Sequence, residues 1–150
     1  MQQQSHTIVK RILQCVAVLS VVACAGETAE WQAATQARQY YESLAEGDAV
    51  RFLEGKAGIE HQPADYGEQL LKAVEQYRDE RERKHGGIRS VRISDNTLQG
   101  AVQKGRGKDC DCRQADGTVK AFLILCYGDS TQEEILVPMV EVKDGEWRMK

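Results

Sequence analysis

The first half of the chain shows apolar positions at helical spacing. Between residues 28 and 46, apolar side chains recur at steps of three and four: Trp31, Ala34, Ala37, Tyr41 and Leu44. This spacing predicts an amphipathic helix over Thr28–Glu46 that ends at Gly47. Asp48 can cap a short second helix over Asp48–Glu54. The next segment, Gly55–Pro63, has the composition of a loop.

A third helix is predicted from Asp65, because Glu68 follows it at capping-box spacing. One face of this helix carries Leu70, Ala73, Val74 and Tyr77. The helix continues through a charged run to Lys84, in which two oppositely charged pairs stand four residues apart: Asp79–Arg83 and Glu80–Lys84. We interpret that run as a solvated face, ended by two glycines at positions 86 and 87.

After Gly87 the apolar period changes from 3.6 to 2, which predicts strands. They are expected around Val91 and Ile93, weakly over Thr97–Gln103, over Val119–Tyr127, over Ile135–Val142 and around Trp147 and Met149. Asp144-Gly145 is a strong hairpin signal before the last strand. Helices followed by a strand meander predict an α+β fold, with the N-terminal helices packed on an antiparallel sheet of about four strands.

The two central strands are apolar on both faces. In the first, Leu123 and Leu125 alternate with Ile124 and Cys126, which are also apolar. One face should carry the helices. The other must then meet a second subunit, a curled-over sheet that lines a pocket, or a ligand.

Composition restricts the class of protein. The 150 residues fit one domain, and 41% apolar with 29% charged residues is typical of a folded globular chain. The net charge of −3 argues against a nucleic-acid partner, which requires a concentrated basic face.

The N-terminal segment predicts export. Lys10-Arg11 precedes an apolar run of 12 residues, Ile12–Ala23, which is too short to cross a bilayer. A basic flank, a short apolar region and small residues at its end are what a signal peptide requires, and a buried N-terminal element is the alternative. We therefore expect residues 1–23 to be removed, leaving 127 residues with a net charge of −5.

Val21-Val22-Ala23-Cys24 resembles the bacterial lipobox, in which the cysteine is lipidated and becomes the new N-terminus, although Val21 stands where leucine is commoner. Ordinary secretion with cleavage after Ala25 is the rival, because Ala23-Cys24-Ala25 fits the A-x-A rule. We expect lipidation at Cys24, with palmitate-type acyl chains holding the protein to a membrane of the cell envelope, on the periplasmic or the surface side. Residues 24–29 would form a tether and 30–150 a single domain.

No cofactor or metal site is predicted. Cys110 and Cys112 stand one residue apart, closer than zinc ligands usually do, and the glycines near them do not form a phosphate loop. Cys126 should be a small buried apolar residue, and the redox state of the three thiols stays open. His61 and His85 have no carboxylate or nucleophile placed beside them by spacing, so no catalytic residue is assigned.

Two segments carry a family resemblance. Residues 40–48, YYESLAEGD, and the closing segments YGDS at 127–130 and VPMVEVKDGEW at 137–147 resemble small bacterial lipoproteins of unknown function with a nuclear-transport-factor-2-like domain. The resemblance implies helices wrapped on a strongly curved antiparallel sheet, a cone that often holds a pocket. Between Gln103 and Gly117 the chain departs from that pattern with a longer polar connection. Enzymes of this fold, such as ketosteroid isomerase and scytalone dehydratase, use an Asp, Tyr or His in the pocket, but no such role transfers to a residue here.

The expectation is therefore a lipid-anchored envelope protein without catalysis, which binds a small hydrophobic ligand or a protein through the cone or pairs with a second copy through the exposed sheet face. The alternative is a pocket enzyme of isomerase, dehydratase or hydrolase type. That alternative requires a buried Asp, Glu or His inside the cone.

Overall fold

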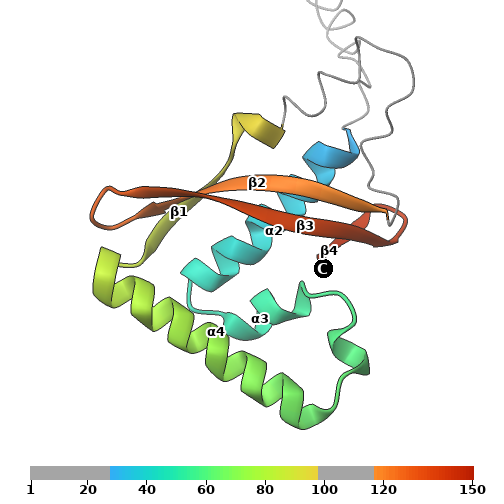
Figure 1. The fold of residues 1–150 in the computed structure, drawn as a ribbon, viewed down its shortest axis with the longest axis horizontal. Helices are drawn as coiled ribbons and strands as arrows, with labels where there is room; N and C mark the ends of the chain where they lie inside the picture. The colour runs from blue at the N-terminus through green and yellow to red at the C-terminus, as the bar shows by residue number, and fades with distance from the viewer. Residues whose placement is uncertain (1–27, 98–116) are drawn as a thin grey trace, which may run out of the picture.

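The computed structural model describes residues 28–97 and 117–150 (Figure 1). Its elements are, in order, α2 (Ala29–Ala45), α3 (Ala49–Glu54), the 3-10 turn η1 (Ile59–His61), α4 (Ala64–His85), β1 (Ile88–Ile93), β2 (Thr118–Tyr127), β3 (Gln132–Lys143) and β4 (Glu146–Met149). The predicted signal peptide, Cys24, Cys110, Cys112 and all but Thr97 of the weak strand lie outside the described residues.

Local signals set the first two helices. The Thr28 side chain accepts a hydrogen bond from the Trp31 N–H, and the Asp48 side chain accepts one from the Arg51 N–H. Both satisfy N–H groups that the first turn of a helix leaves without partners. The predicted cap of α3 at Asp48 is thus confirmed, while the expected loop over Gly55–Pro63 contains the short turn η1.

The predicted start of α4 is wrong. The helix begins at Ala64 after Pro63, whose side chain makes no cap, so Asp65 is already helical and cannot act as the capping residue. Asp65 instead places a negative charge in the first turn, where the helix dipole favours it. The far end agrees with prediction, because Gly86 closes the helix at a φ of 72°. Of the two charge pairs expected along α4, Glu80–Lys84 forms, whereas Asp79 pairs with its neighbour Arg78.

The four strands form an antiparallel sheet in the order β1-β2-β3-β4, as the strand pattern predicted. The central pair, β2 and β3, aligns Leu123 with Ile135 and Ala121 with Val137, so these four side chains share one face. Figure 1 shows α2 crossing that sheet, with α3 and α4 following along its flank. The arrangement is an α+β cone, with helices on the inner face of a curled sheet.

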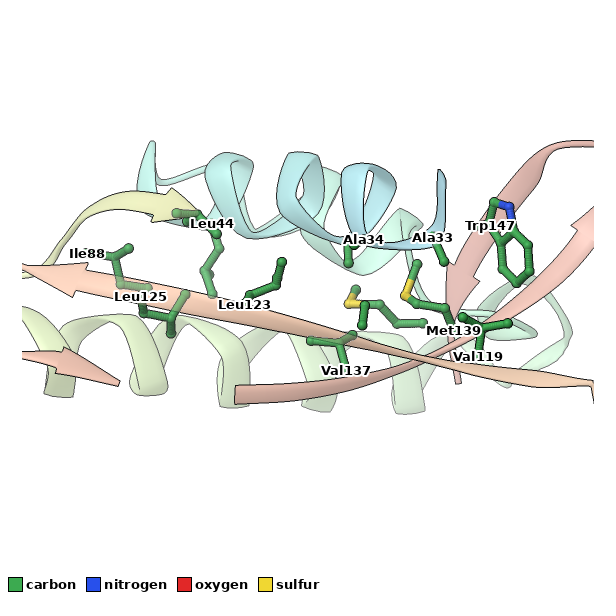
Figure 2. Close-up of a cluster of buried hydrophobic side chains, with 14 of the residues drawn as sticks. Ala33, Ala34, Leu44, Ile88, Val119, Leu123, Leu125, Val137, Met139 and Trp147 are labelled. Atoms are coloured by element: carbon green, nitrogen blue, oxygen red, sulfur yellow. The ribbon is translucent and has the colours of Figure 1, made fainter. Parts of the chain in front are cut away.

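The core lies between α2 and the inner face of the sheet (Figure 2). Alanines on α2 allow close approach to the strands, and the side chains with less than 2% exposure include Trp147, Leu44, Leu123, Leu125 and Met139. Tyr66 is 41% exposed and lies outside this core. It lies in the first turn of α4, a helix that has no buried residue.

α4 is therefore loosely attached along its length. It packs against α3 and β1. None of the described helices combines the length and the apolar character needed to cross a membrane.

Candidate functional site

An apolar hollow of about 230 Å³ lies where the cone is incompletely filled. We call it the groove. Its wall comes from α2, α3, α4 and the ends of β3 and β4: Tyr41, Phe52, Leu53, Lys56, Leu70, Val74, Leu136, Val137, Pro138, Met149 and Lys150. The groove exists because α4 contributes only half-buried side chains, which leave space between that helix and the sheet.

A second hollow of about 250 Å³ extends the groove along α4. It shares Tyr41, Phe52 and Val74 with the first and adds Ala73 and Tyr77. The Tyr41 and Phe52 rings meet edge to face, with centroids 5.1 Å apart, which fixes the wall that both hollows share. Together they form an elongated apolar channel that ends at Tyr77.

Tyr41 contributes a polar atom to this wall. Burial, followed by the neighbouring Tyr77 and Glu133, raises its pKa to about 12. Its hydroxyl therefore stays protonated at neutral pH and can donate a hydrogen bond. The groove wall is mostly apolar, and its residues with polar side-chain groups are Tyr41, Lys56 and Lys150.

Beyond Tyr77 stands a polar group that we call the Arg81 cluster: Tyr77, Arg81, Tyr127 and Glu133. The Arg81 guanidinium lies 3.1 Å from Glu133 Oε2 and 4.9 Å from the centre of the Tyr77 ring. The Tyr127 hydroxyl donates to Glu133 at 2.6 Å, and burial followed by this hydrogen bond raises the pKa of Tyr127. The cluster attaches the C-terminal half of α4 to the sheet, and its carboxylate is already occupied by two donors.

The structure places each histidine near a carboxylate. His61 is exposed, with Glu60 3.7 Å away. His85 Nδ1 lies 2.9 Å from Asp129 Oδ2, and its ring packs on Tyr127. Hydrogen bonds from Thr131 and then from His85 lower the pKa of Asp129 to about 2. Asp129 lies 44 residues from His85 along the chain, so sequence spacing could not place the two side by side.

The prediction that Cys126 is a buried apolar residue is confirmed only in part. Cys126 is a free cysteine, but it lies on the outer sheet face with intermediate exposure instead of in the core. In residues 28–97 and 117–150, no three His, Cys, Asp or Glu side chains gather in a way that could hold a metal ion.

Sequence reasoning missed the Arg81 cluster, although one signal was available. Alternation along β3 places Glu133 on the same face as Ile135 and Val137, the face that meets the helices. A charge at an inward position needs a partner, and Arg81 on the facing helix supplies it.

Comparison with known proteins supports the fold. No family model and no curated protein matches the chain. Among solved structures, the chain is similar to a protein described as an NTF2-like transpeptidase from Campylobacter jejuni, with a TM-score of 0.51 and 13% identity over 77% of this chain and 94% of that one. At this identity the likeness concerns the fold alone. The chain thus has an NTF2-like fold, as its curled antiparallel sheet and covering helices indicate.

Proposed function

We propose that this protein is a non-catalytic binding module of the bacterial cell envelope, anchored by lipid on Cys24, which holds an apolar group in the groove between α4 and the sheet. The observation that carries the proposal is the composition of the groove wall: nine of its eleven residues are aliphatic, aromatic or proline, with two lysines. Binding sites for small molecules are typically apolar with a few placed polar groups.

The same wall argues against the alternative of a pocket enzyme. Proton abstraction of the isomerase or dehydratase kind needs a base such as a carboxylate or imidazole within reach of the substrate, and the Tyr41 hydroxyl, whose pKa is raised to about 12, stays protonated and cannot serve as that base. Among the described residues, no Asp, Glu or His lines either hollow of the channel. Glu133, whose charge helps to raise the pKa of Tyr41, is engaged by Arg81 and Tyr127.

The lipid anchor rests on the sequence. The basic flank, the short apolar run and the lipobox-like Val21–Cys24 segment support cleavage before Cys24 and acylation of its thiol. Intact-mass and N-terminal mass spectrometry of protein isolated from membranes tests this. Residues 1–23 should be absent and Cys24 should carry the mass of acyl chains, and Cys24→Ala should release the protein from the membrane. An unmodified Cys24, or a chain that keeps Met1, would contradict the anchor.

Binding is tested with the chain from Gly26 to Lys150 and the apolar fluorophore 8-anilinonaphthalene-1-sulfonate. We expect saturable fluorescence enhancement that Val74→Arg abolishes, because the new side chain enters the groove. Glu75→Arg, one residue along on the exposed side of α4, is the matched control and should bind the dye normally. Equal dye binding by both variants would show that the dye does not bind in the groove and would contradict the proposal.

A further inference from the structure

The strands β3 and β4 differ greatly in length. β3 has 12 residues and β4 has four, and their pairing begins only at Met139. On its other side β3 pairs with β2 from Gln132 to Val140. The first half of β3 is therefore paired with β2 on one side and has no paired strand on the other among the described residues.

One contact shows which residues of β3 direct their main-chain N–H and C=O groups toward this free edge. The Lys150 N–H donates to the Pro138 carbonyl at 2.9 Å, so Pro138 directs its main-chain groups toward the β4 side. In an antiparallel ladder the direction alternates from residue to residue. The N–H and C=O groups of Leu136 and Glu134 therefore point to the same side, past the end of β4.

Those main-chain groups have no partner in the described part of the chain, since no hydrogen bond joins them to β4, α3 or α4. Leu136 is 47% exposed, so the edge is also accessible. The position of Pro138 also indicates an edge, because proline lacks an N–H and is tolerated in sheets mainly where that N–H would face away from a paired strand.

The groove lies beside this edge. Its wall includes Leu136, Val137 and Pro138 of β3 and Met149 and Lys150 at the end of β4, with Leu70 and Val74 of α4 also contributing. The hollow thus occupies the place where a continuation of β4 would run. An unpaired edge is a template for another strand, and here an apolar space adjoins it.

We propose that the occupant of the groove is an extended peptide, which adds to the free edge of β3 antiparallel to it and in line with β4. This inference rests on the proposed binding function and names its ligand class. The peptide would exchange main-chain hydrogen bonds with Leu136 and Glu134, and its alternate side chains would fill the groove.

The unpaired main-chain N–H and C=O groups beside the groove favour an extended peptide over a small molecule, because a peptide backbone offers matching groups at the same spacing. A second copy of the domain is a poorer occupant, because its own α4 would flank its own β3 edge and approach the same space. A single strand brings no such helix.

The geometry also specifies the pattern of the peptide. Cross-strand partners share a face, so residues that hydrogen bond to Leu136 and Glu134 carry their side chains on the outer, partly exposed face. Their neighbours point into the groove and should be apolar. Glu134 lies on that outer face, which favours basic residues among the polar ones, because oppositely charged cross-strand pairs attract.

The test uses the detergent-solubilised full chain and a fluorescein-labelled eight-residue peptide that alternates valine and lysine, followed by anisotropy. Two matched peptides carry N-methyl groups on the lysine amides or on the valine amides. Because only the lysine amides would face β3, the first should bind at least about tenfold more weakly than the parent peptide, and the second should bind like the parent.

Leu136→Pro removes the edge N–H without touching the β2 ladder and should abolish peptide binding, whereas Leu136→Val should retain it. Amide hydrogen exchange at Leu136 and Glu134 should slow when the peptide is added. Equal affinity for the two methylated peptides, or unchanged exchange, would overturn strand addition. So would a self-associated chain that Leu136→Pro makes monomeric, since the edge would then bind a second copy.

The dye experiment separates this inference from the proposed function. If the fluorophore binds in a manner that depends on Val74 and the peptide does not bind, the groove remains a binding site but not for a strand. If neither binds, the proposed function fails as well.

Discussion

The Tyr127 hydroxyl and the Arg81 guanidinium meet the same oxygen of Glu133, at 2.6 and 3.1 Å. Glu133 and Tyr127 lie on adjacent strands, whereas Arg81 belongs to α4. The three groups thus connect the sheet to the C-terminal half of a helix that has no buried residue. We regard this contact as the main polar attachment of α4 beside the groove.

Glu133→Gln is expected to destabilise the protein modestly. It removes the charge that Arg81 meets while keeping the shape of the side chain, and a partly exposed pair of this kind contributes up to about 1 kcal/mol. The free energy of unfolding from urea titration should fall by that amount, and the difference should shrink at high salt. Glu80→Gln breaks the exposed pair with Lys84 and should leave the curve almost unchanged. Equal effects for the two variants would contradict a special role for Glu133.

Tyr41 should make the protein sensitive to alkaline pH. Burial raises its pKa to about 12, above the value near 10 of an unfolded tyrosine. The resulting stability is fully present below pH 10. It is lost between pH 10 and 12, because the unfolded chain releases its proton first. The loss is ~2–3 kcal/mol over that window.

Unfolding curves measured from pH 8 to 12 check this expectation. Tyr41→Phe should flatten the decline in the free energy of unfolding, with a remainder from Tyr127, whose pKa is also raised by burial. Tyr66→Phe, at a residue that is 41% exposed, should leave the decline as it is. A wild-type curve that does not fall above pH 10 would show that Tyr41 is hydrated.

Two glycines should respond oppositely to alanine. A Cβ at Gly55 would lie 2.5 Å from the Tyr40 ring, so Gly55→Ala forces that ring or the backbone to move and should cost about 1–3 kcal/mol. A Cβ at Gly67 meets nothing within 4 Å and lies inside α4. Gly67→Ala should therefore stabilise the protein by about 0.5–1 kcal/mol. Thermal unfolding of the pair measures both signs, and a stabilising Gly55→Ala would show that the Tyr40 ring moves aside easily.

Sequence predicted the elements well where short-range signals decide them. Thr28, Asp48 and Gly86 act within four residues, and the capping and turn chemistry of those residues is local. Asp65 shows the limit of such signals, because a proline two residues earlier already starts the helix.

The candidate site could not be predicted in the same way. Arg81 and Glu133 are brought together by the tertiary fold, and so are His85 and Asp129. The free edge of β3 arises from a mismatch between the lengths of β3 and β4, which the apolar pattern of either strand does not contain. In contrast, the sequence shows that both faces of β2 carry apolar side chains. It does not identify what covers the outer face.

That outer face should pair with a second copy of the chain. Phe122 and Ile124 lie there at intermediate exposure, and Val142 is 46% exposed. Sedimentation velocity of the chain from Gly26 to Lys150 should show a dimer that dissociates on dilution, since burying such side chains drives association. Val142→Glu places a charge in the contact and should shift the equilibrium to monomer. Val50→Glu, at a residue that is 57% exposed on α3, should leave the dimer intact. A wild-type chain that stays monomeric at millimolar concentration would rule out pairing through this face.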